Sequence, residues 1–459
     1  MKLIAAFFGA VLLATPTASR ANTARTIEMS EFGEVELQSP IGSAMGFIVA
    51  FSGAGGIVES DRIAIRKLTD AGFAVAVIDT GVALRDLDQP HPSRSCVDLS
   101  GPLEWLSANV EHSLGWQQYR APLLFGQGAG GRLAYVALVQ SSPRTFAGAL
   151  SVDFDPRLAL RTSFCQLPFE VGPEGRRALL PSVRLRASWL VGTTAALDTA
   201  ASQFVAAAHG EMGVQPPVLL APDTVAAAYR KGAAMLRSGA TWNGPPSVAD
   251  LPLVEVAATT TRDLLAIIYS GDGGWRDIDK QVGGIMAAKG IAIVGVDCLH
   301  YFWTEKPPAQ VGDDLARIIT HYMAAWHIRH VILLGYSFGA DILPFAYNEL
   351  PAEIQGKINM ISLLSPERAA DFEIRILGWL GAAPGSGARP LQPETVRINP
   401  TKMQCIFGAD DASISLCTDP TARTMEVIER PGGHHFDHNY QALAKIVLAG
   451  ACGRGVACS

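Results

Sequence analysis

The sequence lacks several features that would each define a class of protein. Its net charge is only −6 over 459 residues, with 37 Lys and Arg against 43 Asp and Glu. With so little positive charge, no nucleic-acid partner is expected. After the N-terminus, no segment reaches the roughly 18 uninterrupted apolar residues of a membrane-spanning helix. Apolar residues still make up 49% of the chain, which suits two or three globular domains with buried cores.

The N-terminus has the pattern of a signal peptide. Lys2 supplies a positive charge, and Leu3 to Ala14 form an apolar stretch that is too short to cross a bilayer. Small residues follow, and Ser19-x-Ala21 is a suitable cleavage site. We therefore predict that residues 1–21 are a signal peptide and that the mature protein is soluble and exported. A buried N-terminal strand is the alternative.

Seven cysteines agree with an oxidising compartment. The pairs that their positions favour are Cys96 with Cys165, Cys405 with Cys417 and Cys452 with Cys458, which leaves Cys298 over. Sequence alone does not fix this connectivity, and fully reduced thiols remain the alternative.

The most informative motif is Gly-Tyr-Ser-Phe-Gly at residues 335–339, which follows an apolar run at 331–334 and precedes a helix-compatible segment. A strand, a Gly-x-Ser-x-Gly turn and a helix form the nucleophile elbow of serine hydrolases. The turn is so tight that its flanking residues must be small, and it lifts the hydroxyl of Ser337 above the sheet. The backbone N–H of Phe338 then points to the position where a tetrahedral oxyanion forms. A chance turn is the alternative.

In this fold the catalytic acid follows the serine in the chain and comes after a strand. The apolar segment Met403–Phe407 is such a strand, and Gly408, Ala409, Asp410 and Asp411 follow it. We predict Asp411 as the acid, because the acid usually comes three residues after the glycine that ends the strand. Asp410 is the second candidate, and a solvated acidic turn is the alternative.

The catalytic base is expected after a further strand near the C-terminus. Thr424–Glu429 is that strand, and we predict that His434, the first residue after two glycines, takes the serine proton. His435 is the second candidate. His434, His435, Asp437 and His438 are also of zinc-ligand types. Because these four crowd one loop without i, i+4 helical spacing, and a serine nucleophile needs no metal, we predict neither a metal nor another cofactor.

A second oxyanion donor normally lies after the first core strand of this fold. Leu264–Tyr269 reads as that strand, and the glycine-rich loop Ser270–Trp275 follows it. We predict the backbone N–H of Asp272 as the donor, since the glycines let main chain approach a substrate. An ordinary βα turn is the alternative. The loop carries neither Gly-x-Gly-x-x-Gly nor a P-loop pattern, so a phosphate site fits less well.

The two halves of the chain repeat one another. The matching segments are 46–56 with 264–274, 71–79 with 289–297, and 122–130 with the elbow. Short strand patterns that alternate with helical patterns predict an α/β fold of two tandem α/β-hydrolase-like, doubly wound sheets. Gly128 stands where the second half has Ser337, so the first half lacks a nucleophile. We predict a degenerate domain at 22–243 and a catalytic domain at 250–459, with Asn243–Ser247 as the linker.

Four motifs carry a resemblance to a known family. They are Tyr269–Trp275, Tyr301–Pro307, Gly335–Pro344 and Gly433–Asp437. With them, the second half resembles the bacterial virulence proteins VirJ and AcvB, and the two-domain layout is similar to the AcvB form. The resemblance implies a periplasmic serine lipase that cleaves the ester joining lysine to lysyl-phosphatidylglycerol. It also implies roles in membrane-lipid homeostasis, acid tolerance and virulence through type IV secretion.

The expected partner is an aminoacylated phospholipid at the membrane surface. A lysine esterified through its carboxyl group presents two ammonium groups, which carboxylates or aromatic faces would meet. Glu305, Asp272 and the aromatic run Tyr301-Phe302-Trp303 are the candidates, with Glu305 and Trp303 taken as the substrate-binding pair. Core packing of the aromatics is the alternative. A second hypothesis for the whole chain is a non-catalytic periplasmic adaptor that binds type IV secretion substrates or secretion-system proteins.

Overall fold

The computed structural model describes residues 24–89, 96–157, 159–194, 199–210, 214, 217–220, 224–238, 247–256, 258, 262–374 and 387–456. The predicted signal peptide and most of the predicted linker lie outside these residues. None of the helices in the described part of the chain has both the length and the apolar character needed to cross a membrane.

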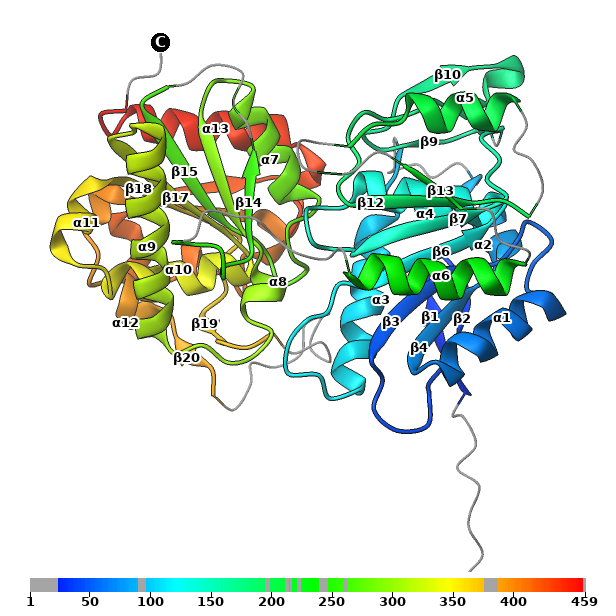
Figure 1. Ribbon diagram of the computed structural model, residues 1–459. Helices are drawn as coiled ribbons and strands as arrows, with labels where there is room; N and C mark the ends of the chain where they lie inside the picture. The colour runs from blue at the N-terminus through cyan, green and yellow to red at the C-terminus, as the bar shows by residue number, and fades with distance from the viewer. Residues whose placement is uncertain are drawn as a thin grey trace, which may run out of the picture.

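The N-terminal half is built on an eight-stranded sheet (Figure 1). In spatial order its strands are β1 (Ala24–Met29), β2 (Gly33–Gln38), β4 (Phe73–Ile78), β3 (Gly46–Phe51), β6 (Leu123–Gln127), β7 (Gly148–Val152), β12 (Ser188–Gly192) and β13 (Val218–Leu220). The pairs β1–β2 and β2–β4 are antiparallel, and the other neighbours run parallel.

The C-terminal half repeats this arrangement in a seven-stranded sheet. Its strands are β14 (Leu253–Val256), β16 (Ala292–Val296), β15 (Leu264–Tyr269), β17 (His330–Tyr336), β18 (Ile358–Leu364), β21 (Met403–Gly408) and β22 (Glu426–Arg430). β14 is antiparallel to β16, as β2 is to β4, and the remaining pairs are parallel. The predicted fold class of two tandem, mainly parallel α/β sheets is confirmed.

Helices cover both faces of each sheet. In the N-terminal half they are α1 (Glu59–Asp70), α2 (Thr80–Leu87), α3 (Ser100–Ser113), α4 (Ala129–Gln140), α5 (Thr199–Ala207) and α6 (Val225–Ser238). In the C-terminal half they are α7 (Ile278–Ala287), α8 (Cys298–Tyr301), α9 (Pro308–Trp326), α10 (Phe338–Asn348), α11 (Ala352–Lys357), α12 (Gln392–Thr395) and α13 (Tyr440–Cys452). The shorter strands form small sheets of their own. One contains β10 (Phe169–Val171), β11 (Arg177–Leu179) and β8 (Ala159–Leu160). In the others, β5 (Cys96–Val97) pairs with β9 (Ser163–Phe164), and β19 (Ala369–Ala370) pairs with β20 (Arg389–Pro390).

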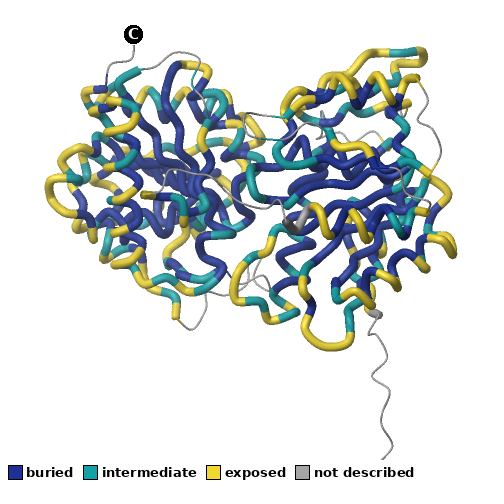
Figure 2. Tube along the Cα trace, in the orientation of Figure 1, coloured by how far each residue is buried: buried dark blue, intermediate teal, exposed yellow. Residues whose placement is uncertain are grey.

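Apolar side chains along the central strands point alternately to the two faces of the sheet, so helices must pack on both faces. In β15, Leu265 and Ile267 join the core formed with α9 and α10, whereas Ala266 and Ile268 join the core formed with α7 and α13. Every residue of this strand is buried, as is usual for parallel sheets enclosed by helices. Figure 2 shows the central strands of both halves as buried throughout.

Candidate active site

The elbow forms as predicted, and its geometry explains its glycines. Ser337 lies between β17 and α10 with φ 52° and ψ −121°, a conformation that non-glycine residues rarely adopt. A Cβ on Gly335 would lie 2.4 Å from the carbonyl oxygen of Gly339, and one on Gly339 would lie 2.2 Å from that of Tyr269. Because both contacts are with backbone, only glycine fits at either position. The serine is thus held at the carboxyl end of the sheet.

The structure brings the predicted base to the predicted nucleophile. His434 Nε2 lies 2.8 Å from Ser337 Oγ, although the two residues are 97 positions apart in the chain. The loops that follow β21 and β22 meet closely, because a Cβ on Gly408 would lie 2.2 Å from the carbonyl oxygen of Gly433. This close approach sets His434 beside the acid loop.

Asp411 rather than Asp410 faces the imidazole. Asp411 Oδ2 lies 3.3 Å from His434 Nδ1 and its side chain is 20% exposed, whereas Asp410 is an exposed residue. A proton on Nδ1 that is shared with this carboxylate leaves Nε2 as the acceptor toward Ser337. His435, the second candidate base, lies instead 3.5 Å from Asp277 Oδ2, and its Nδ1 is 3.4 Å from Tyr336 Oη.

The glycine-rich loop passes directly beside the nucleophile. A Cβ on Gly271 would lie 3.8 Å from the Cβ of Ser337. The loop turns tightly at Asp272, because the N–H of Gly274 donates to the carbonyl oxygen of Gly271 at 3.1 Å. The two predicted oxyanion donors, the N–H groups of Asp272 and Phe338, therefore belong to segments that flank the serine. Their role as donors stays a prediction.

The N-terminal half contains the same elbow without the hydroxyl. Gly128 has φ 54° and ψ −114°, close to the values of Ser337. A Cβ on Gly130 would lie 2.2 Å from the carbonyl oxygen of Ser52, as one on Gly339 would from that of Tyr269. The backbone of the first half thus keeps the turn, but residue 128 at its apex has no hydroxyl.

One known protein family matches the second half of the chain. Residues 263–454 match the family model described as bacterial virulence protein (VirJ). The C-terminal domain is VirJ-like. The matched range contains the four motifs that carried the resemblance, which is thereby confirmed for this domain. A comparison with curated proteins gave no match.

Several solved structures are similar to part of the chain. Est1E from Butyrivibrio proteoclasticus, solved with ferulic acid bound, is 12% identical over 44% of this chain and 95% of its own, with a TM-score of 0.33. A lipase-esterase related protein from Clostridium acetobutylicum is 16% identical over 43% of this chain and 98% of its own, with a TM-score of 0.33. An esterase from Pyrococcus furiosus is 13% identical over 46% of this chain and 94% of its own, also with a TM-score of 0.33.

Carboxylates gather around the nucleophile of the VirJ-like domain. Asp341, in the first turn of α10, is buried, and its Oδ1 accepts a hydrogen bond from the backbone N–H of Glu367 at 2.7 Å. Burial raises the pKa of Asp341 well above its ordinary value, and the carboxylates of Glu367, Asp272 and Asp371 raise it further. Burial also raises the pKa of Asp272. Burial therefore disfavours the charged forms of both carboxyl groups beside the elbow.

The two residues predicted to bind substrate lie differently. Glu305 is exposed. Trp303 is buried against the N-terminal half, where its Nε1 donates to the carbonyl oxygen of Trp116 at 2.9 Å and its ring packs 3.8 Å from that of His112. This favours the alternative of core packing for Trp303. Phe302 is also buried, with its ring 5.0 Å from that of Phe338.

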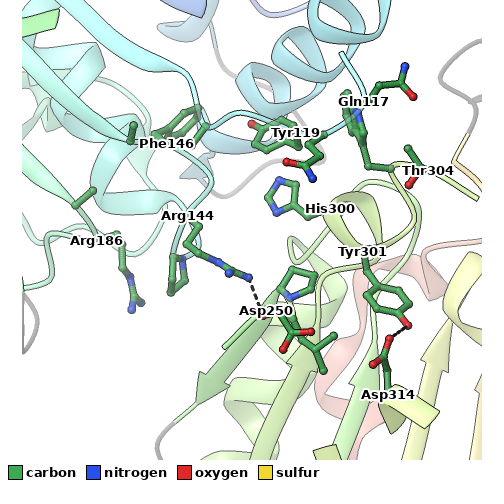
Figure 3. Close-up of a pocket in the computed structure, with 18 of the residues that line it drawn as sticks. Gln117, Tyr119, Arg144, Phe146, Arg186, Asp250, His300, Tyr301, Thr304 and Asp314 are labelled. Atoms are coloured by element: carbon green, nitrogen blue, oxygen red, sulfur yellow. Dashed lines mark hydrogen bonds between the residues drawn. The ribbon is translucent and has the colours of Figure 1, made fainter. Parts of the chain in front are cut away.

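Trp303 also lines a cavity of about 1050 Å³ between the two halves. The cavity residues labelled in Figure 3 include Tyr119 and Arg144 from the N-terminal half and His300 from the VirJ-like domain. Neither the candidate nucleophile nor its two partners line this cavity. It is therefore separate from the proposed centre of reaction.

Two predicted disulfides form. Cys96 pairs with Cys165, and Cys405 pairs with Cys417, which closes a loop around Asp411. Cys298 is a buried free thiol, as predicted. Cys452 is disulfide-bonded, and its predicted partner, residue 458, lies outside the described residues.

Sequence reasoning missed two groups that hold the base. The hydroxyl of Tyr336, inside the elbow motif, donates to the carbonyl oxygen of His434 at 3.3 Å, and Ser365 Oγ donates to the same oxygen at 3.5 Å. Tyr336 occupies the first variable position of the Gly-x-Ser-x-Gly motif, so the motif located this residue but did not indicate that it contacts His434. Ser365 has φ 49° at the end of β18, which no local sequence signal announced.

Proposed function

We propose that the VirJ-like domain is a serine ester hydrolase in which Ser337 is the nucleophile, His434 the base and Asp411 the residue that orients the imidazole. The observation that carries the proposal is the 2.8 Å contact between Ser337 Oγ and His434 Nε2, with Asp411 on the other ring nitrogen. A hydroxyl needs such a base to attack an ester at neutral pH.

The proposed reaction has two stages, acylation of Ser337 and hydrolysis of the acyl-enzyme. His434 Nε2 takes the proton of Ser337 as its Oγ attacks the ester carbonyl carbon, and the N–H groups of Phe338 and Asp272 bind the oxyanion. Collapse of the tetrahedral intermediate breaks the ester bond, and the imidazolium protonates the departing alcohol. Water then attacks the acyl-enzyme with His434 again as the base, which releases the acid and restores the serine.

For the substrate we propose lysyl-phosphatidylglycerol, so that lysine is the acyl group and phosphatidylglycerol is the leaving alcohol. The family resemblance supports this substrate. Asp272 belongs to the loop that passes beside Ser337, so its carboxyl group is our candidate partner for an ammonium group of the lysine. The disulfides support an oxidising compartment, and we propose the periplasm as the location.

The test is hydrolysis by the purified full chain of lysyl-phosphatidylglycerol in vesicles, with free lysine measured. We expect lysine release without fatty-acid release, and complete loss with Ser337→Ala. Vesicles of phosphatidylglycerol alone are the control for cleavage of acyl chains. Release of fatty acid but not lysine would reject the substrate, and lysine release by Ser337→Ala would reject the mechanism. If Ser337→Ala restores the lipid composition of deficient cells, a non-catalytic adaptor is the better account.

A further inference from the structure

The glycine-rich loop at residues 270–276, which carries one proposed oxyanion donor, is held from outside its own domain. Ser142, just after α4 of the N-terminal half, donates its hydroxyl to the carbonyl oxygen of Trp275 at 2.7 Å, and both residues are buried. Arg276 donates to the carbonyl oxygen of Gly101 in α3 at 3.4 Å. Two consecutive residues of the loop therefore bind the N-terminal half.

Glu104 of α3 lies beside the same loop. A Cβ on Gly274 would lie 3.4 Å from Glu104 Oε1, and the same oxygen lies 3.4 Å from His300 Nε2. The other ring nitrogen of His300 lies 3.3 Å from Asp297 Oδ2, at the end of β16. Burial raises the pKa of Glu104 well above its ordinary value, followed by the effect of Asp297. Glu104 and His300 therefore face each other across the boundary between the two halves.

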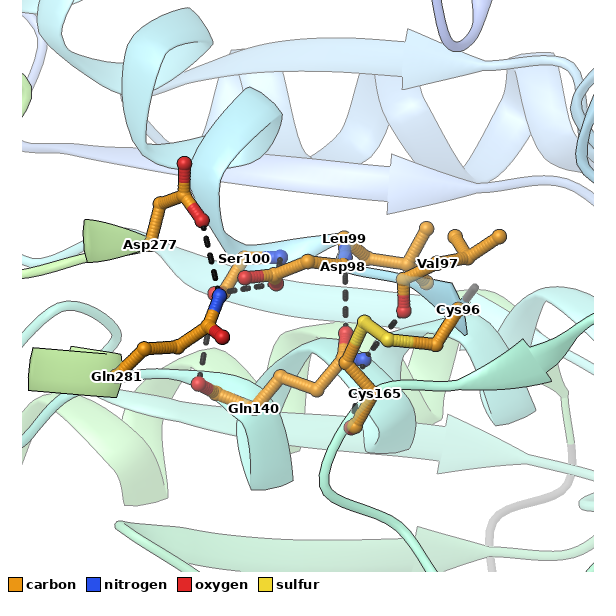
Figure 4. The surroundings of a disulfide bond; sticks show 9 residues. All are labelled: Cys96, Val97, Asp98, Leu99, Ser100, Gln140, Cys165, Asp277 and Gln281. Atoms are coloured by element: carbon orange, nitrogen blue, oxygen red, sulfur yellow. Dashed lines mark hydrogen bonds between the residues drawn. A yellow bond between two sulfur atoms is a disulfide. The ribbon is translucent and has the colours of Figure 1, made fainter. Parts of the chain in front are cut away.

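The end of α4, next to Ser142, is itself held in place within the N-terminal half. Gln140, the last residue of α4, donates to the carbonyl oxygens of Val97 and Cys165 at 2.7 and 3.1 Å, beside the Cys96–Cys165 disulfide (Figure 4). The carbonyl oxygen of Gln140 accepts a hydrogen bond from Lys280 Nζ of α7 at 2.9 Å. The groups that hold the loop thus rest on a cross-linked part of the first half.

We propose that the N-terminal half is a brace that positions the loop at residues 270–276, so that the Asp272 N–H is aimed at the oxyanion. Ser142 and Glu104 are its positioning residues. The expected effect of the brace on the reaction rate rests on the proposed function, whereas its expected effect on the mobility of the loop does not. A donor placed in advance lowers the barrier only while it stays in place, and loss of Ser142 Oγ leaves a buried carbonyl unpaired.

Adjacent serines supply a matched test. Ser142→Ala removes the cross-domain hydrogen bond, whereas Ser141→Ala removes one to Leu138 within the N-terminal half. For the full chain with a soluble aminoacyl ester, we expect Ser142→Ala to lower kcat about tenfold with KM within twofold. Hydrogen exchange at residues 270–276 should become faster. Ser141→Ala should leave kcat and that exchange within twofold of the parent protein.

A second pair tests the same brace if Ser142→Ala does not fold. Glu104→Gln keeps the shape and packing of the side chain and should preserve kcat, while Glu104→Ala should lower it and loosen the loop. Equal effects of the Ser142 and Ser141 variants on both kcat and exchange would overturn the proposal. The exchange measurement needs no activity, so it stands even if the Ser337→Ala comparison rejects the proposed function.

A separate feature lies on the loop that follows the base. Donor atoms of Asp277, His435 and His438 all lie within 4.8 Å of one another. His435 Nδ1 is 3.5 Å from Asp277 Oδ2. The hydroxyl of Tyr440 donates to the same Oδ2 at 3.1 Å and lies 3.0 Å from His438 Nδ1. The phenol therefore orients two of the three donors, as outer-shell groups do in metal sites.

We infer that this cluster binds a zinc ion through two imidazoles and one carboxylate, with a fourth position left to water. Because His435 follows His434 directly, the ion would restrain the loop that carries the base. The test is equilibrium dialysis and thermal unfolding of the full chain with Zn²⁺ alone. We expect one equivalent bound at micromolar concentration and a raised Tm, both lost in His438→Ala and kept in His321→Ala. Binding that persists in His438→Ala, or no binding by the parent protein at 100 micromolar zinc, would overturn the inference.

Discussion

Replacing Gly339 by alanine tests whether the elbow depends on close backbone contact. The new Cβ would lie 2.2 Å from the carbonyl oxygen of Tyr269 and 2.6 Å from that of Ser270. Neither atom is the end of a flexible side chain. To restore ordinary contact, α10 and the end of β15 must separate by about 1 Å.

The magnitude follows from that displacement. Overpacking of this kind destabilises a core by about 1–3 kcal/mol. The same movement shifts Ser337 relative to His434 and to the loop at residues 270–276, and a misplacement of about 1 Å lowers a rate by about 100-fold. We therefore expect Gly339→Ala to lose both stability and kcat, with the loss in rate measured per folded molecule.

Two other glycines serve as controls in the same assays, which are chemical unfolding and ester hydrolysis. A Cβ on Gly356 in α11 meets nothing within 4 Å, so Gly356→Ala should be neutral or stabilising and fully active. Gly130→Ala creates the matching 2.2 Å clash in the N-terminal half, where no nucleophile lies. It should cost similar stability but lower kcat less than Gly339→Ala does, since it leaves Ser337 and His434 in place. If Gly339→Ala is as stable and active as Gly356→Ala, the reasoning about close approach is refuted.

Three further predictions concern the acid, its loop and a buried carboxyl group. Asp411→Asn should lower kcat by about 10⁴, while Asp410→Asn should lower it less than fivefold, as measured by ester hydrolysis at saturating substrate; equal losses would reject the choice between them. Replacing both Cys405 and Cys417 by alanine should lower the free energy of unfolding by about 3 kcal/mol, because the disulfide closes a separation of 12 residues. Burial raises the pKa of Glu111 from 4.5 to about 8, so the folded state holds a proton that the unfolded state has lost between these values. Stability should therefore fall as pH rises from 4.5 to 8, by roughly 5 kcal/mol at most, and Glu111→Gln should flatten this slope in urea unfolding at several pH values.

The parts of the site that follow from local rules were visible in the sequence. The elbow needs a strand, two small residues and a helix in order, and all three are written in consecutive residues. Cys405 and Cys417 bracket Asp411 closely, so position favoured their pairing, which the structure contains. The strand Leu264–Tyr269 was predicted with the bounds that the structure gives, because an apolar run between Asp263 and the glycine-rich loop leaves little choice.

The parts that depend on packing between the two halves were not visible. Tyr301, Phe302 and Trp303 form an aromatic run in the sequence, and nothing local says which surface buries it. Trp303 meets Trp116 across 187 positions of chain. Ser142 and Glu104 carry no motif, and they matter only because α3 and α4 dock against the loop at residues 270–276. Such contacts come from the fold as a whole, so spacing cannot report them.

The duplicated elbow separates what the fold requires from what chemistry requires. Gly128 and Ser337 share nearly the same dihedral angles, so the turn itself serves the packing of strand on helix in both halves. Glycine adopts a positive φ without strain, whereas a residue with a Cβ is destabilised there by about 1–3 kcal/mol. The first half uses the unstrained residue. The second half keeps a strained serine that glycine could replace with less strain. That serine is also the one that meets an imidazole at 2.8 Å. Strain retained at a position where the hydroxyl meets an imidazole argues that the hydroxyl is used.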